Sequence, residues 1–150
     1  MSTVNPHVLQ VEREKTMPVL VRFLCALDGG CWVVGSRADF RRPERITPTS
    51  DWDLLVPFAS WEATAQAILA FKESDDVRDL RPTRYGGWRF AVPDKHHSTP
   101  NVSCTALVDV FAGDIGAWLL KPHTLAAWHP KSGTIVEKPL GEQESVRGTL

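Results

Sequence analysis

The pattern of apolar and polar positions predicts two amphipathic helices in the first half of the chain. Apolar residues recur at helical spacing over 17–27, and Gly29-Gly30 ends this stripe. A second stripe runs over 61–69 directly after Ser60, a residue type that caps helix N-termini. Each stripe needs a partner surface on which to bury its apolar face, so we expect both helices to pack against a sheet.

Short apolar runs bounded by glycine, proline or polar residues predict the strands of that sheet. Strands are expected at 31–35 ("CWVVG"), 51–57 ("DWDLLVP") and 102–113, with a hairpin within 81–94 that turns at Gly86-Gly87 through a two-residue loop. The remaining predictions are a short helix at 114–120, a weaker helix followed by a strand within 123–140, and loose polar segments at 1–15 and 141–150.

Helices interleaved with buried strands indicate an α/β (α+β) fold, a mixed β-sheet with flanking helices. The chain has 150 residues, which is the size of one domain with a substantial hydrophobic core. We therefore expect a single domain over residues 1–150, with its core at about 17–113.

Composition narrows the possible partners. The formal net charge is -1, so the chain as a whole carries no electrostatic footprint for nucleic acid or anionic membrane, and a polyanion contact would have to be local. The three cysteines form no CxxC pair, which favours buried thiols in a reducing compartment. Neither a signal peptide nor a stretch of transmembrane length is present, so a cytoplasmic protein without a membrane partner is expected.

An acidic pair stands at the start of the second predicted strand. Side chains alternate across a strand, so Asp51 and Asp53 point to the same side and repel each other unless one takes a proton or both bind a cation. Such pairs are common without any metal. Asp109 changes this interpretation, because it interrupts the apolar run "ALVDVF", where an unpaired charge would be costly. It either pairs with an arginine or joins the first two carboxylates in a site for divalent cations.

The first predicted strand ends in Gly35-Ser36. Glycine lets a ligand approach the backbone, and a serine hydroxyl with nearby N–H groups can hold a phosphate. Gly-Ser ends many strands for turn reasons alone, so the pair gains meaning only because an acidic pair follows it.

These motifs together resemble a known signature. "VVGSRA" followed by "SDWDLLV" resembles the polymerase-β-type nucleotidyltransferase superfamily, especially its minimal, stand-alone members, and Asp109 in "LVDVF" fits the later acidic residue of that family. The resemblance covers about residues 17–113, most of the chain, and the combination of motifs is more specific than any one of them.

The resemblance implies a metal-dependent transfer of a nucleoside monophosphate from a nucleoside triphosphate, such as ATP, to an acceptor. Asp51 and Asp53 would hold the metals that bind the triphosphate, and Asp109 the metal near the acceptor. The metal would be Mg2+, with Mn2+ as the alternative. Gly35, Ser36 and Arg37 would contact the triphosphate; their order and spacing match the family motif.

Two departures from the family leave the acceptor open. The loop over 37–50 is a few residues longer than usual and carries Arg41, Arg42 and Arg45, most of which we expect to be solvated, although one could grip a phosphate. The large helical domain that selects acceptors in many relatives is missing, so the acceptor can be a protein, an RNA or a small molecule.

Two other classes of function remain. The first is a non-catalytic nucleotide- or partner-binding module on the same fold, comparable to small antitoxin-like members of the superfamily. The second is a sugar transferase with a DxD motif, which would need neither Ser36 nor Asp109 and ranks last. The His96-His97 pair lies in a turn-rich stretch, where an exposed loop is expected.

Overall fold

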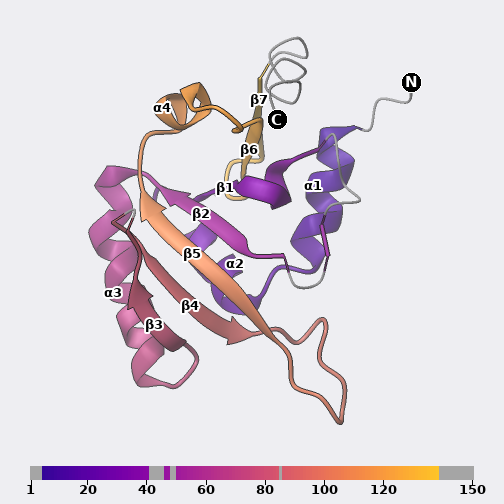
Figure 1. The fold of residues 1–150 in the computed structure, drawn as a ribbon, viewed down its shortest axis with the longest axis vertical. Coiled ribbons are helices and arrows are strands. Elements are labelled where there is room, and N and C mark those ends of the chain that lie inside the picture. Colours follow the sequence, from indigo (N-terminus) through magenta and orange to yellow (C-terminus); the bar gives the residue numbers. More distant parts are fainter. Residues whose placement is uncertain (1–4, 41–45, 48–49, 85, 139–150) are drawn as a thin grey trace.

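A mixed sheet forms the centre of the molecule. The computed structural model describes residues 5–40, 46–47, 50–84 and 86–138. In these residues seven strands are ordered β3-β4-β5-β2-β1-β6-β7 (Figure 1). Their bounds are β1 Trp32–Val34, β2 Trp52–Val56, β3 Arg78–Pro82, β4 Trp88–Pro93, β5 Thr105–Ala112, β6 Ala126–His129 and β7 Thr134–Glu137. The expected α+β fold is confirmed.

The pairing of the two central strands, β2 and β5, brings side chains from distant parts of the sequence together. β2 and β5 run parallel, whereas the other neighbours in the sheet run antiparallel. Parallel strands need a long crossover connection, and here it contains a helix and the β3–β4 hairpin. The crossover places β5, which is distant in sequence, directly beside β2, with Asp53 opposite Asp109.

One face of the sheet carries the main core. Helices α2 (Val19–Ala26) and α3 (Trp61–Glu73) lie behind the strands in Figure 1, and their apolar stripes pack on this face. Alternate residues of the central strands point into it, so that Leu54 and Val108 are fully buried together with Leu24 and Ile68 from the helices. The predicted strand over 51–57 and the helix after Ser60 are confirmed.

In the part of the chain that the structure describes, the opposite face is covered at one end. Helix α4 (Ile115–Leu120) and strand β6 close a small second cluster there, in which Val34, Leu55 and Ala127 are buried. Away from this cluster the face is accessible, and Leu107 of β5 is exposed on it. The side chains of β2 and β5 that alternate with the core residues, including Asp53 and Asp109, therefore lie on the uncovered face.

A helix forms where the sequence predicts a loose arm. Asn5 accepts a hydrogen bond from the backbone N–H of His7 and caps helix α1 (Pro6–Lys15), whose first residue is a proline. Arg13 of this helix reaches the backbone carbonyl oxygens of Arg37 and Asp39. Contacts between residues so far apart in the sequence leave no periodic pattern of apolar residues. The sequence analysis therefore did not predict this helix.

Two further predictions need correction. Residues 126–137 form the antiparallel pair β6–β7, so the strand expected within 123–140 is present but the weaker helix is not. Five residues, 83–87, separate β3 from β4, and the backbone N–H of Thr83 donates to the carbonyl oxygen of Gly87. The hairpin is therefore closed by a longer loop than the two-residue turn predicted at Gly86-Gly87. None of the described helices is long and apolar enough to span a membrane.

Candidate functional site

Three carboxylates meet in the middle of the uncovered sheet face. Asp53 and Asp109 are direct neighbours across the parallel pair β2–β5. Asp51, two residues before Asp53, points to the same side of the sheet. The structure thus brings together all three acidic residues that the sequence analysis selected, although 56 positions separate Asp53 from Asp109.

An arginine that the sequence analysis did not select holds two of these carboxylates. Arg89 of β4 donates from Nε to Asp109 Oδ1 over 2.9 Å and from Nη2 to Asp109 Oδ2 over 3.0 Å. The same Nη2 donates to Asp51 Oδ2, also over 3.0 Å. Such a bidentate pair is among the stronger ion pairs, and the carboxylate of Asp109 raises the pKa of Arg89. The sequence analysis offered an arginine or the other carboxylates as alternative neighbours of Asp109. In the structure Asp109 has both.

Strand register explains why these residues meet. Asp53 pairs with Asp109, Asp109 with Arg89, and Arg89 with Arg81, so one row crosses four strands on the uncovered face. Residues directly opposite each other in a sheet have their Cβ atoms within about 5.5 Å. The side chains of this row are acidic on β2 and β5 and basic on β4 and β3, so opposite charges meet between β5 and β4.

The carboxylates differ in their electrostatic surroundings. Burial, together with the negative charges of Asp109 and Asp51, raises the pKa of Asp53 to about 7, and the positive charge of Arg89 only partly opposes this. The guanidinium of Arg89 donates its hydrogen bonds to Asp51 and Asp109. Without a metal ion, Asp53 is the position where the cluster holds a proton near neutral pH.

This raised pKa predicts an unusual pH dependence of stability in metal-free buffer. An unfolded aspartate titrates near pH 4, so between about pH 4 and 7 the folded chain holds a proton that the unfolded chain has released. The contribution of Asp53 to the free energy of unfolding is therefore greatest below pH 4 and is lost as the pH rises toward 7, by at most about 1.4 kcal/mol per pH unit. Denaturant unfolding of wild type and Asp53→Asn in EDTA measures it.

The test is the difference in unfolding free energy between the wild type and Asp53→Asn. Asp53→Asn should gain stability relative to wild type as the pH rises from about 4 to 7. Asp28→Asn is the matched control, because Asp28 is fully exposed at the end of a surface turn. A difference between Asp53→Asn and wild type that does not change with pH would show that Asp53 titrates normally.

The glycine of the Gly35-Ser36 pair lies against Asp53. A Cβ added at Gly35 would come within 2.2 Å of Asp53 Oδ2, and the backbone there has a φ of +72°, which favours glycine. Ser36 follows in the short 3-10 turn Gly35–Ala38 and is exposed. Gly35 thus lies beside the carboxylates on the β1 side, and Ser36 follows it in sequence, where the family resemblance expects a triphosphate.

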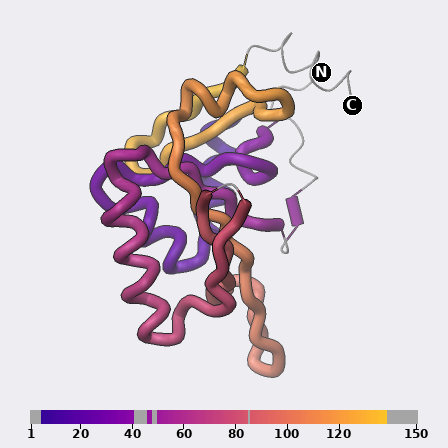
Figure 2. Tube along the Cα trace, turned by 60° about the vertical axis from the view of Figure 1, so that its left-hand side comes forward, coloured from indigo at the N-terminus to yellow at the C-terminus, as the bar shows by residue number. Residues whose placement is uncertain are grey.

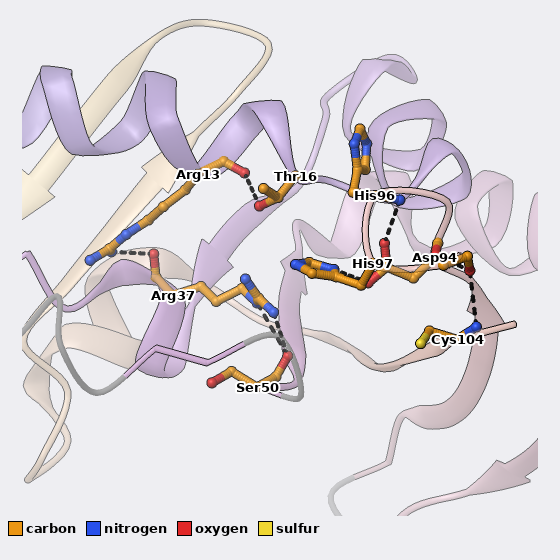
Figure 3. A network of polar contacts seen from close by, with 9 residues as sticks. Arg13, Thr16, Arg37, Ser50, Asp94, His96, His97 and Cys104 are labelled. Carbon is orange, nitrogen blue, oxygen red and sulfur yellow. Dashed lines mark hydrogen bonds and ion pairs between the residues drawn. The ribbon is translucent and has the colours of Figure 1, made fainter. Parts of the chain in front are cut away.

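Arg37, in contrast, points into the protein. Its side chain is only 3% exposed, its guanidinium lies 4.2 Å from the centre of the Trp52 ring, and its Nη2 donates to the backbone oxygen of Ser50 over 2.6 Å (Figure 3). Its own carbonyl oxygen accepts from Arg13 and Trp128. We therefore assign Arg37 a structural role at the entry to β2, in place of the phosphate contact expected from the resemblance. Arg41, Arg42 and Arg45 lie outside the described residues.

A histidine and a buried aspartate are paired in the loop between β4 and β5, which projects from the sheet at the lower end of the molecule (Figure 2). Nδ1 of His97 contacts Oδ2 of Asp94, and the backbone N–H of His96 donates to Oδ1 of the same carboxylate (Figure 3). Ser98 and Cys104 continue this network through the backbone. The loop expected at His96-His97 is present, with His96 exposed, but His97 is partly buried and organises the loop.

A cleft of about 960 Å³ opens beside the carboxylates. It follows β5 from Asp109 toward helix α4, and Asp53 and Arg89 line it together with Asp109. The cleft lies on the β5 side of the cluster, whereas Gly35 and Ser36 lie on the β1 side.

Oxygen ligands of this kind suit hard divalent cations such as Mg2+, which bind carboxylates at about 2.0–2.1 Å. In the arrangement observed, however, no group of three or more His, Cys, Asp or Glu side chains is placed to hold a metal ion among the described residues. Arg89 takes the position between Asp51 and Asp109 that a shared cation would need. The three carboxylates are the residues that would hold such a cation, and they could do so only after the guanidinium withdraws.

Comparison with known proteins adds no family assignment. No protein-family model matches the chain, and no curated protein matches it either.

Proposed function

We propose that the chain is a metal-dependent nucleotidyltransferase, which transfers a nucleoside monophosphate from a nucleoside triphosphate to an acceptor. The observation that supports this most directly is the meeting of Asp51, Asp53 and Asp109 on two adjacent parallel strands, with Gly35 in contact with Asp53. The resemblance of the sequence motifs to the nucleotidyltransferase signature also supports the proposal, although Arg37 of that motif is buried away from the carboxylates.

The proposed reaction is an in-line displacement at the α-phosphorus. An oxygen of the acceptor hydroxyl forms a bond to that phosphorus, the bond from it to the bridging oxygen breaks, and pyrophosphate leaves. The hydroxyl proton passes to the carboxylate of Asp109, which lies at the cleft. Bound divalent cations would supply neutralisation of the charge on the phosphates, and Asp51, Asp53 and Asp109 are the residues that would hold them.

Arg89 acquires a specific role in this proposal. In the structure its positive charge balances Asp51 and Asp109, which would otherwise repel each other on a partly buried surface. A divalent cation and the guanidinium compete for the same carboxylate oxygens. Arg89 is 35% exposed and lines the cleft, so after release it can swing toward solvent or toward a phosphate oxygen.

The same ion pairs favour a second candidate function, a non-catalytic nucleotide- or partner-binding module. If Arg89 permanently takes the place of the cation, the carboxylates form a neutralised structural cluster. The proposed enzyme requires the exchange of Arg89 for metal, and the module requires that no exchange occurs. The two candidates thus differ in whether the cluster binds a divalent cation.

Titration with Mn2+, followed by calorimetry and by electron paramagnetic resonance, separates these candidates. We expect the wild type to bind Mn2+ with a nucleoside triphosphate present, and Asp51→Asn to weaken this binding at least about tenfold. Arg89→Gln should bind Mn2+ more tightly than wild type, because the competing cation is gone. Arg22→Gln, on helix α2, is the matched control and should bind like the wild type.

The four nucleoside triphosphates are compared in the same titration, which identifies the base. Mn2+ binding that neither Asp51→Asn nor Arg89→Gln changes would place the metal elsewhere and contradict the proposal. No Mn2+ binding by wild type or by Arg89→Gln would favour the non-catalytic module.

A further inference from the structure

The cleft beside the carboxylates has positive charge on both of its rims. Arg81 and Arg84 line it from the β3–β4 hairpin, and Lys121 lines it from the end of helix α4. All three residues are exposed. These three cations outnumber the carboxylate of Asp114, which also lines the cleft, so the rims are predominantly cationic although the formal net charge of the chain is -1.

Aromatic side chains lie between these cations. Phe58, two residues after the end of β2, lines the cleft and is 70% exposed. Lys121 Nζ lies 4.9 Å from the centre of the Trp118 ring, and Trp118 in turn packs on Phe111 with their ring centres 5.0 Å apart. Lys121 is thus held at the rim by an aromatic surface, while Phe58 leaves a ring face available. Cations that contact phosphates and aromatic rings that stack on bases are the combination found in clefts for single-stranded nucleic acid.

The positive charge continues past the cleft along the edge strand β3. Arg78 pairs with Ala91 and Arg81 with Arg89, two residues of β4 that share one face. A bulge between Arg78 and Arg81 shifts the register, so the two arginines lie on the same face although they are three residues apart. Arg78 is exposed, like Arg81. Charges spaced along a strand in this way complement a polymer with repeating phosphates better than they complement a mononucleotide.

We infer that the cleft between β3 and helix α4 binds the end of a single-stranded nucleic acid. Arg78, Arg81 and Lys121 contact phosphates, and Phe58 stacks on a base. Asp109 stands at the inner end of the cleft, so the strand's terminal hydroxyl reaches the carboxylates from the side opposite Gly35. That the nucleic acid is the acceptor of the transfer rests on the proposed function. The binding itself requires neither metal nor triphosphate.

Fluorescence anisotropy of a labelled single-stranded RNA of about 12 nucleotides tests the inference, in EDTA and without triphosphate. The wild type should bind with an affinity that falls as the salt concentration rises. Arg81→Ala with Lys121→Ala should weaken binding at least about tenfold and lower the salt slope by about 2, one for each charge removed. Phe58→Ala should weaken it about fivefold or more, with a smaller effect on the slope.

Lys72→Ala is the matched control, because Lys72 is an exposed lysine on helix α3, which packs on the other face of the sheet. It should bind RNA like the wild type, and circular dichroism checks that every variant is folded. Absence of RNA binding by the wild type, or equal binding by the wild type and the cleft variants, would overturn the inference. So would displacement of the RNA by uridine monophosphate or by polyglutamate at the same concentration of charged units.

The two proposals fail in different ways. Asp109→Asn should keep RNA binding, because the measurement contains no metal and the substitution removes a negative charge from the cleft. Loss of RNA binding in the cleft variants, combined with an absence of nucleotidyl transfer to RNA, would support the binding site and contradict the enzyme. Nucleotidyl transfer to another acceptor, without RNA binding, would support the enzyme and contradict the RNA-binding site.

Discussion

Asp109→Asn is expected to lower the rate of nucleotidyl transfer at least about a thousandfold while the protein remains folded. The carboxylate of Asp109 lies next to Asp53 and at the cleft, so both the charge that would hold a cation and the group that takes the acceptor proton are removed. Asparagine keeps the size of the side chain and an oxygen that accepts from Arg89. Release of pyrophosphate, measured with a nucleoside triphosphate, Mg2+ and single-stranded RNA, reports the rate.

The control for this substitution is Asp28→Asn, a change of the same chemistry at a fully exposed position. Its rate should equal that of the wild type. If Asp109→Asn and Asp28→Asn had the same rate as the wild type, Asp109 would have only the structural role of pairing with Arg89. The unfolding free energy of both variants is measured alongside, so that a folding defect is not mistaken for lost catalysis.

Arg37→Ala should lower the free energy of unfolding by about 3–5 kcal/mol. The substitution removes the contact of the guanidinium with the Trp52 ring and its hydrogen bonds to the backbone oxygen of Ser50. It also leaves a void, because Arg37 is only 3% exposed. A domain of this size is stable by only about 5–15 kcal/mol, so a loss of this size is readily measured by urea denaturation.

Arg81→Ala serves as the comparison, since Arg81 is an exposed arginine of an edge strand and should change the unfolding free energy by less than about 0.5 kcal/mol. The family resemblance makes the opposite prediction for Arg37, namely weaker triphosphate binding without a loss of stability. Unchanged stability of Arg37→Ala together with a lost affinity for nucleoside triphosphate would therefore return Arg37 to the binding site.

The sequence was most informative where local rules apply. Alternation across a strand is a property of consecutive residues, so the shared orientation of Asp51 and Asp53 could be predicted without knowing their neighbours. The charge of Asp109 in an apolar run could be recognised as exceptional for a similar reason, since burial of an unpaired charge is costly in any fold. The helices α2 and α3 followed from their apolar stripes.

The partners of these residues depend on contacts between distant segments. Arg89 meets Asp109 because β4 pairs with β5 in one particular register, and a shift by one residue would turn Arg89 to the other face of the sheet. Nothing in the segment "RPTRYGGWRF" distinguishes Arg89 from Arg81 or Arg84. Helix α1 was missed for the same reason, because Arg13 finds its acceptors on residues 37 and 39.

Local patterns in the sequence were enough to single out the three carboxylates, the glycine beside Asp53 and the class of fold, because period, capping and the cost of burial act over a few consecutive residues. Which charges neutralise each other depends on contacts between distant segments. The fold turns Arg37 toward Trp52, brings Arg89 to Asp51 and Asp109, and places a cleft with cationic rims along β5 from Asp109 toward helix α4. Electrostatic interactions depend on distance in space, and that distance is set by strand register and packing.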